Sequence, residues 1–350
     1  MDRIGKNCIE LIAQNLTFNE IAAFKTCKLI NSIDFYKNIK QTSLITNAKE
    51  KIAHCKNLTY VEVFEEISLK DLPHLEEVKF SGPIFMIDNI KRIHVICMRY
   101  EDIDKLCEYL HRKVQAVSLR FTTEFIGYNL IKMIKDANPK NLGVAGTLNK
   151  FMPVFDMDLE KFDINGLTAE LGTTDNPPIK NSSIKELSFS FMNVTNQINM
   201  PNLKRLALYC CSIELSRLTC KTIEELELFE CKTDKNRLAE FPLRKLIINN
   251  CESMLTGPAV ELKSLVELEI MNCKDDTIRL IDSAFKMPAL RVLAFKNEFV
   301  TRKKLECATW PIKTINVVKS SISPLDKAYF ESKGISVQVY NGSTQEQMPS

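Results

Sequence analysis

Hydrophobic residues in the centre of the chain recur at fixed places within a repeated nine-residue pattern. The clearest copies are LKRLALYCC from Leu203, IEELELFEC from Ile223, LRKLIINNC from Leu243 and LVELEIMNC from Leu265. Each copy places apolar residues at positions 1, 4 and 6 and a cysteine at position 9, and successive copies start 20, 20 and 22 residues apart. Because side chains alternate along a strand, positions 4 and 6 predict a short strand with one buried face. The constant spacing predicts a stacked array of similar units.

Weaker copies of the pattern extend in both directions from this central block. Upstream they begin at Leu58, Leu75, Ile90, Val114, Pro139, Leu159 and Ile184, and downstream at Leu290 and Ile312, with a last apolar run, GISVQVY, from Gly334. From Leu58 to Ile312 the array advances 254 residues in twelve steps, or about 21 residues per step. We expect a strand in each copy. The first two steps, of 17 and 15 residues, leave the repeat register of residues 51–100 open.

This pattern resembles the leucine-rich repeat, and specifically its cysteine-containing intracellular variety. The resemblance implies an α/β solenoid, the leucine-rich-repeat horseshoe, with a parallel sheet on its concave face and helix or irregular chain on its convex face. The array is expected to occupy residues 51–340 in about 13–14 turns. A buried Cys at position 9 can bond backbone groups of neighbouring turns, although its S–H is a weak donor. The position-9 cysteines are Cys211, Cys231, Cys251 and Cys273.

The longer steps leave room for helices on the convex face. Helical spacing of apolar residues predicts helices in FIGYNLIKMIKDA before Pro139, DIDKLCEYLHRK from about Asp102, DDTIRLIDSAF from Asp275 with Asp276 as a cap, and SPLDKAYFESKG near the end. In the last of these, Ser323 is the expected N-cap and Gly334 the expected stop. Residues 341–350 have the composition of a disordered tail.

The first fifty residues show helical spacing without the strand pattern, and they predict a small helical N-terminal module. Residues 4–31 resemble the F-box, a helical module that docks on a Skp-type adaptor in a cullin–RING ubiquitin ligase, although Ile4-Gly5 replace its Leu-Pro and its Trp is absent. The resemblance implies adaptor-binding residues Ile4, Ile9, Ile12, Leu16, Glu20 and Ile21. The alternative is that residues 1–50 only cap the open end of the solenoid core.

Composition and charge narrow the functional classes. The 350 residues are 45% hydrophobic and 26% charged, which excludes a largely disordered or fibrous chain. Forty-seven Lys and Arg against 44 Asp and Glu argue against a dedicated nucleic-acid binder. No apolar run reaches the roughly 18 residues of a membrane span, and charges interrupt the first ten residues where a secretory signal would be apolar. We therefore expect an intracellular protein, cytoplasmic or nuclear, whose twelve cysteines are free thiols.

Catalytic and metal-binding patterns are missing from the sequence. Its four histidines, His54, His74, His94 and His111, occupy different repeat positions, and no Cys–His set has zinc-site spacing. No nucleophile-elbow, Walker-type or dinucleotide-binding motif occurs. The expectation is a protein that is not an enzyme and that needs neither a metal nor a cofactor.

Positions 5 and 7 of each repeat should face a partner on the concave side. Position 7 holds Tyr209, Phe229 and Met271 in one column, and Phe191 stands at position 8 of its repeat. Aromatic and Met side chains at such positions are enriched in recognition surfaces. The acidic residues of the same region are Glu227, Glu230 and Glu269. A basic protein segment with an apolar anchor is therefore the expected partner.

Two functions remain open. One is a substrate-recognition subunit of a cullin–RING ubiquitin ligase of the SCF type, in which the helical module docks the adaptor and cullin complex and the concave face holds the substrate. The other is a non-enzymatic leucine-rich-repeat scaffold in which residues 1–50 act only as a cap. Neither involves nucleic acid or a membrane, and the substrate, phosphorylation dependence and oligomeric state stay open.

Overall fold

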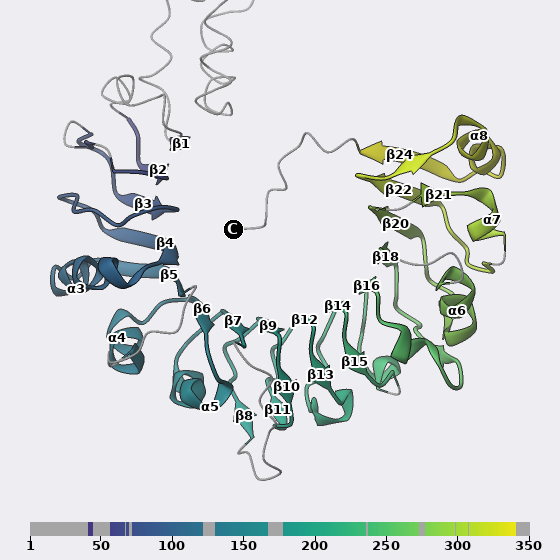
Figure 1. Cartoon of the computed structure of the whole chain (residues 1–350), viewed down its shortest axis with the longest axis horizontal. Coiled ribbons are helices and arrows are strands. Elements are labelled where there is room, and N and C mark those ends of the chain that lie inside the picture. Colours follow the sequence, from purple (N-terminus) through teal and green to yellow (C-terminus); the bar gives the residue numbers. More distant parts are fainter. Residues whose placement is uncertain are drawn as a thin grey trace, which may run out of the picture. The chain divides into compact units, whose positions relative to one another are not determined.

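A computed structural model describes most of the repeat array in atomic detail. The described residues are 41–44, 57–66, 68–69, 72–121, 130–166, 178–235, 237–272, 277–297, 299–306 and 308–340. They belong to two compact units, the first within Met1–Ala145 plus Met157–Leu159 and the second within Gly146–Asp156 plus Glu160–Ser350. Each unit is a parallel sheet with helical or irregular chain on its outer side (Figure 1). The predicted α/β solenoid with a parallel sheet is therefore confirmed.

In the first unit, each strand pairs in parallel with the next one along the chain. The strands are β1 (Gln41–Leu44), β2 (Tyr60–Val63), β3 (Glu77–Phe80), β4 (Arg92–Met98), β5 (Gln115–Phe121) and β6 (Asn141–Ala145). Val61, Val78 and Ile93 lie opposite one another and are fully buried. The strands expected from Leu58, Leu75 and Ile90 are thus confirmed in the register of the repeat. The sheet begins earlier than predicted, because β1 lies in the range for which the sequence indicated only helices.

The copy starting at Val114 was aligned one residue out of register. The pattern placed Val117 at core position 4, whereas the structure pairs Ala116 with Ile93 and then Ser118 with His94. Val117 is therefore an extra residue on β5, a β-bulge. A second irregularity lies between Val95 and Met98 on β4. The reason for the error is physical: Ala116 and Val117 are both apolar, so either can fill the core position.

The second unit repeats one strand register nine times. Its main strands are β7 (Lys161–Asn165), β9 (Glu186–Ser190), β12 (Arg205–Tyr209), β14 (Glu225–Phe229), β16 (Lys245–Asn249), β18 (Glu267–Met271), β20 (Val292–Lys296), β22 (Thr314–Val318) and β24 (Ser336–Tyr340). Each pairs in parallel, position for position, with its neighbour. Leu226 and Leu228, at positions 4 and 6, are fully buried. Burial of these columns is the main driving force for stacking.

The core thins at the last strand. Val317, at position 6 of β22, is fully buried, whereas Val339, its equivalent on β24, is 41% exposed. Within the described residues, β24 pairs with β22 alone. This end of the unit therefore carries the weakest core contacts of the series.

Outside the main sheets, helices and two-residue strands carry the chain back to the next repeat. The α-helices are α3 (Ile103–His111), α4 (Leu130–Ala137), α5 (Leu148–Phe151), α6 (Thr277–Ala284), α7 (Arg302–Leu305) and α8 (Pro324–Ser332). The 3-10 helices are Tyr100–Asp102, Met152–Asp156, Leu215–Arg217, Leu238–Glu240 and Glu252–Leu255. The short outer strands are β8 (Ile179–Lys180), β10 (Asn193–Val194), β11 (Ile198–Asn199), β13 (Ser212–Ile213), β15 (Lys232–Thr233), β17 (Val260–Glu261), β19 (Phe285–Lys286), β21 (Phe299–Val300) and β23 (Ser321–Ile322).

The four helices predicted from the sequence correspond to α4, α3, α6 and α8. Ser323 is the N-cap of α8, and its Oγ accepts a hydrogen bond from the Asp326 N–H at 3.0 Å. Gly334 follows the helix with a φ of 78°, the left-handed conformation that glycine adopts most easily. The proposed cap Asp276 and the start of the segment before Pro139 lie outside the described residues.

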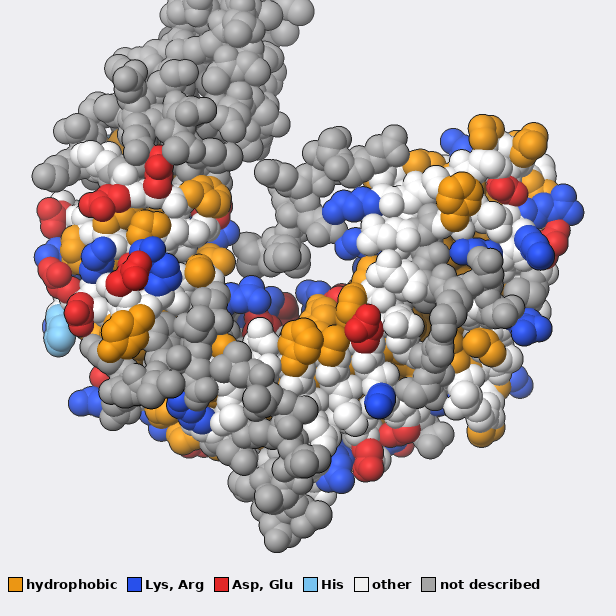
Figure 2. Space-filling view, viewed as in Figure 1, with side chains coloured by type: hydrophobic (Ala, Val, Ile, Leu, Met, Phe, Trp, Pro, Cys, Tyr) orange, Lys and Arg blue, Asp and Glu red, His pale blue; other side chains and the backbone are white. Residues whose placement is uncertain are grey.

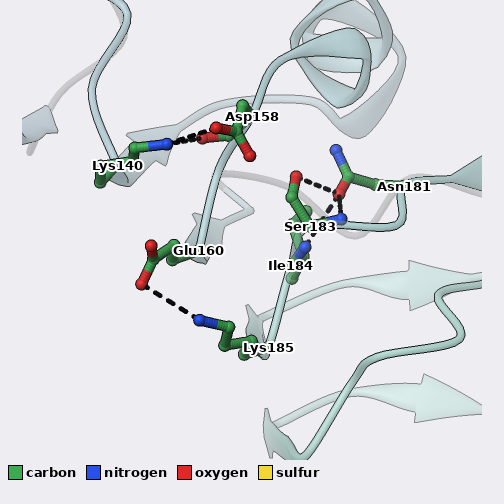
Figure 3. A network of polar contacts seen from close by, with 7 residues as sticks. All are labelled: Lys140, Asp158, Glu160, Asn181, Ser183, Ile184 and Lys185. Carbon is green, nitrogen blue, oxygen red and sulfur yellow. Dashed lines mark hydrogen bonds and ion pairs between the residues drawn. The ribbon is translucent and has the colours of Figure 1, made fainter.

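A polar network fixes the turn that leads into β9 (Figure 3). The Asn181 side-chain oxygen accepts from the N–H groups of Ser183 at 2.8 Å and Ile184 at 2.9 Å, while its NH₂ group donates to the Phe155 carbonyl at 2.7 Å. Asn181 thus ties the start of one repeat to the preceding one. Two ion pairs flank it at the surface: Lys140 with Asp158, and Lys185 with Glu160 at 3.5 Å.

Each repeat leaves the sheet through a left-handed residue at position 8, which the sequence pattern did not reveal. The residues with positive φ at this position are Phe191, Cys210, Glu230, Asn250, Asn272, Asn297 and Lys319. The N–H of Cys210 donates to the Phe229 carbonyl at 2.7 Å, and that of Glu230 donates to the Asn249 carbonyl at 2.8 Å. The bond to the next strand holds a conformation that Asn tolerates and that Phe or Glu adopts at a cost.

The position-9 side chain bonds two backbone carbonyls. The Cys231 thiol donates to the Leu208 carbonyl of the preceding repeat at 3.1 Å and to its own Phe229 carbonyl at 3.2 Å. Ser320 makes the same pair of bonds, to the carbonyls of Phe295 and Val318, in a repeat without cysteine. The predicted bonding of position 9 to neighbouring turns is therefore confirmed, while Cys273 lies outside the described residues.

Replacing Cys231 with Ala should lower the free energy of unfolding by about 1–3 kcal/mol, because two buried carbonyls lose their donor. Cys231→Ser should recover most of that loss, as Ser320 makes equivalent bonds in its own repeat. The matched control is Cys210→Ala, whose partly exposed thiol faces Glu230 and which should change stability by less than about 0.5 kcal/mol. Urea titration monitored by circular dichroism gives all three values. Equal losses for Cys210→Ala and Cys231→Ala would contradict the carbonyl-bridging role.

Candidate protein-binding face

The predicted position-7 column forms a continuous row on the strand-lined face of the second unit. Tyr209, Phe229, Asn249 and Met271 lie opposite one another on β12, β14, β16 and β18. The Tyr209 and Phe229 ring centroids are 6.2 Å apart with the ring planes at 41°. Figure 2 shows hydrophobic side chains gathered on the second unit with a carboxylate beside them. The register therefore places these side chains outside the core, on the face opposite positions 4 and 6.

Burial varies along this row. Tyr209 and Phe229 are half-buried, Met271 is 9% exposed and Asn249 is 1% exposed. The Asn249 side-chain oxygen lies 3.5 Å from the Asn272 NH₂ group, but its own NH₂ group has no hydrogen-bond partner among the described residues. A buried, unpaired donor costs free energy. Sequence reasoning missed Asn249, because an amide at a non-core position of a strand looks like an ordinary surface residue.

The acidic residues of this face are paired with cations that the sequence did not link to them. Arg205 lies 3.4 Å from Glu225 and 3.3 Å from Glu227. Lys245 lies 2.8 Å from Glu267 and, more weakly, 3.7 Å from Glu269. Two cations therefore sit among four carboxylates, and the face keeps an excess of negative charge that is smaller than the sequence indicated.

Burial and these charges shift several pKa values. Burial, reinforced by the Glu227 carboxylate, raises the pKa of Tyr209, so its hydroxyl stays protonated. Burial also raises the pKa of Glu269, and the nearby Lys245 and Lys296 offset this only in part. For Lys245, burial lowers the pKa but the bond to Glu267 and the carboxylates around it outweigh burial, so the pKa is raised. The ammonium group thus stays charged among its carboxylate neighbours.

Phe191 and Glu230 lie at position 8, where the chain turns out of the sheet. Phe191 is 53% exposed, and its N–H donates to the Tyr209 carbonyl at 2.8 Å, which sets it beside the start of the position-7 row. Glu230 is exposed, and the Cys210 thiol lies 3.6 Å from its carboxylate. The structure thus brings the predicted partner-binding residues to one region of β9–β18. The adaptor-binding residues predicted at Ile4, Ile9, Ile12, Leu16, Glu20 and Ile21 lie outside the described residues.

Two structural searches of the described residues return nothing. Residues 57–340, apart from the gaps named above, hold no cluster of three or more His, Cys, Asp or Glu side chains placed to bind a metal ion. No helix in the described part of the chain is long and apolar enough to cross a membrane.

Comparison with known proteins yields two distant structural likenesses. No protein-family model matches the chain, and no curated protein matches it. The crystal structure of an internalin (InlF) from Listeria monocytogenes is 14% identical, with a TM-score of 0.31, and the match covers 92% of this chain and 94% of that one. A protein from Bacteroides fragilis is 12% identical, with a TM-score of 0.29, and the match covers 94% of this chain and 82% of that one. Scores this low transfer no function, so the fold assignment depends on the strand order and register described above.

Replacing Glu269 with Gln should stabilise the protein at neutral pH but not in acid. A raised pKa means that the folded state holds the Glu269 proton more tightly than the unfolded chain does, so stability falls as pH rises through that window. Gln removes this loss. Urea unfolding at about pH 4 and about pH 7 should show the stability difference from the parent growing with pH.

The control for this experiment has the opposite sign. Its bond to Arg237 lowers the pKa of Glu240, so Glu240→Gln should lose stability relative to the parent as pH rises. A Glu269→Gln difference that is flat with pH, or that follows the Glu240→Gln trend, would show that burial does not control the Glu269 carboxyl.

Proposed function

We propose that this protein is a non-enzymatic interaction scaffold whose strand-lined face on the second unit binds a protein segment. The observation that supports this best is the in-register aromatic pair of Tyr209 and Phe229 at non-core positions, continued by Met271 two strands away. Large side chains on such a face cover their neighbours without filling the core, and they offer apolar contact area to a partner. The proposed face performs no chemistry of its own.

The preferred partner is a basic segment with an apolar anchor. An aromatic or aliphatic side chain would pack on Tyr209 and Phe229, while Lys or Arg would approach Glu227 and Glu269. Arg205 and Lys245 already engage those carboxylates, so an incoming cation must share them. We therefore expect the charge contacts to select the partner and guide its approach, and the apolar contacts to supply most of the affinity.

The Tyr209→Ala, Phe229→Ala double variant should lose binding while staying folded. Peptides selected from a displayed random library against the full-length chain should carry Lys or Arg beside an aromatic or aliphatic residue. Their affinity for the double variant should fall at least tenfold, or about 1.4 kcal/mol. The melting temperature should change little, because neither residue is a core position.

The matched control removes two exposed apolar side chains from the outer side, Phe299 and Leu325, which are 61% and 85% exposed. Phe299→Ala with Leu325→Ala should leave the selected peptides bound. If the control weakens them as much as the Tyr209 and Phe229 changes do, the binding face lies elsewhere. A large fall in the melting temperature of the Tyr209, Phe229 variant would instead assign these two side chains to the core.

A second candidate function is substrate recognition within an SCF-type ubiquitin ligase, which would place the protein in the cytoplasm or nucleus. It is supported by the resemblance of residues 4–31 to the F-box. In this role the N-terminal segment would hold the adaptor, and the same strand-lined face would hold the substrate near the ubiquitin-conjugating enzyme. Such positioning raises the effective concentration of the reacting groups.

Co-purification with a Skp-type adaptor tests this second function. The full-length chain should bind the adaptor in a stoichiometric complex, and an Ile12→Asp, Leu16→Asp variant should not, because buried charge would break an apolar helix contact. The control is the Tyr209, Phe229 double variant, which should keep the adaptor. A folded parent that does not bind the adaptor would leave the scaffold function alone.

A further inference from the structure

A linked row of polar side chains lies on the strand-lined face of the first unit, away from the proposed binding face. His94 on β4, Ser118 on β5 and Asn141 on β6 lie opposite one another at position 5. Glu77, at position 3 of β3, reaches across to His94. The sequence analysis gave His94 and Ser118 no role, because residues from four separate repeats meet only through the strand register.

The contacts form a chain of hydrogen bonds. The Ser118 Oγ lies 3.2 Å from His94 Nδ1, and His94 Nε2 lies 2.7 Å from the Glu77 carboxylate. The Asn141 NH₂ group donates to Ser118 Oγ at 3.1 Å. The other Glu77 oxygen accepts from Arg92 at 2.8 Å. The imidazole therefore lies between a serine hydroxyl and an anchored carboxylate, the arrangement that activates serine nucleophiles.

The partners fix the direction of each proton. A carboxylate only accepts, so with a neutral imidazole the proton sits on His94 Nε2 and points at Glu77. The lone pair of Nδ1 then faces Ser118, whose O–H must donate to it. Because Asn141 donates to the same oxygen, the Ser118 hydroxyl has one orientation, with its proton directed at a base.

The β-bulge at Val117 creates this contact. Without the extra residue, the alternation of β5 would set Val117 opposite His94, whereas the observed register shift sets Ser118 there. Bulges re-aim side chains, often next to functional sites. The second irregularity, between Val95 and Met98, lies just beyond His94 along β4, so the distortion stays close to the His94–Ser118 pair.

The surroundings shield this row in part without closing it. The side chains of His94 and Glu77 are each 19% exposed, and the Tyr60 ring lies edge-on to the imidazole with the centroids 6.5 Å apart. Lys79, the residue opposite His94 on β3, pairs with Glu62 at 3.2 Å. Ser118 is half-buried, so a reagent can reach its hydroxyl from the open face.

We propose that Ser118 is a reactive serine that accepts an acyl or phosphonyl group from an activated ester or phosphonofluoridate. His94 is its general base, and Glu77 is a positioning residue that holds the imidazole tautomer. The Asn141 NH₂ group stands beside the nucleophile, where it can donate to an oxyanion formed there. This activity goes beyond the proposed scaffold function and does not depend on it.

The acyl step needs no additional reactant. Ser118 Oγ attacks the ester carbonyl carbon, a C–O bond forms, and the carbonyl electron pair moves onto oxygen as the hydroxyl proton passes to His94 Nδ1. Collapse of this intermediate breaks the bond to the leaving alkoxide, which takes the proton from His94. The products are O-acyl Ser118 and a free alcohol, and water can then release the acid by the same steps in reverse order. With a phosphonofluoridate, the P–F bond breaks instead and fluoride leaves.

The test is labelling of the full-length chain with an alkyl phosphonofluoridate, followed by intact-mass and tandem mass spectrometry. One adduct on Ser118 is expected, and Ser118→Ala should abolish it. His94→Gln should slow labelling by about 100-fold, the usual contribution of a general base. Labelling of the parent should weaken as pH falls, because a protonated imidazole cannot take the hydroxyl proton.

Two further variants separate reactivity from a structural role. Glu77→Gln should slow labelling and move the midpoint of the pH–rate profile to lower pH, because the imidazolium loses a facing negative charge. Ser188, the position-5 serine of β9, has no imidazole partner in its printed contacts, and Ser188→Ala should leave the rate unchanged. Melting curves of all the variants identify any that fail to fold.

Three outcomes would overturn the proposal: no adduct on the folded parent, an adduct mainly on other serines, or a labelling rate that His94→Gln and pH leave unchanged. If His94→Gln does not fold, the pH profile of the parent and the Glu77→Gln rate decide the question. None of these results bears on the binding face of the second unit, which the peptide experiment tests separately.

Discussion

Backbone hydrogen bonding between consecutive repeats controls every other feature of this molecule. In the second unit, the N–H of Lys204 donates to the Lys185 carbonyl and that of Glu224 to the Lys204 carbonyl, both at 2.8 Å, so each strand enters the sheet at the same point. With strands about 4.8 Å apart, a residue type that recurs in the sequence becomes a column in space. Core packing, the position-9 thiols and the partner-binding face are all consequences of this single register.

Much of the fold could be read from the sequence, because apolar residues at positions 1, 4 and 6 carry most of the information. The pattern failed where two solutions bury equal apolar surface, as with Ala116 and Val117. It also could not show the left-handed turn at position 8, since Phe191 and Glu230 have no preference for that conformation and are held in it by bonds to the next strand. The outer two-residue strands escaped notice because they are too short to show periodicity.

The candidate sites differ in the same way. Tyr209, Phe229 and Met271 could be placed in one column, because they share a repeat position. The pairing of Arg205 with Glu227 could not be placed, since it joins position 3 of one strand to position 5 of the next. The His94–Ser118 contact depends on a bulge and was beyond sequence reasoning. Charged and polar networks across repeats thus have to be read from the structure, whereas single columns follow from the pattern.

The thin core at β24 has a consequence for motion. A turn inside the array is held by two neighbours, so opening it breaks two interfaces, whereas β24 contacts only β22 within the described residues. The 41% exposure of Val339 means that little apolar surface is lost to water when this strand lifts away. Local opening should therefore start there and spread inward one turn at a time, so that amide protons on β24 exchange fastest and those on β14 and β16 slowest. The partner-binding row, on the middle strands, would lie in the slowest-opening part of this gradient.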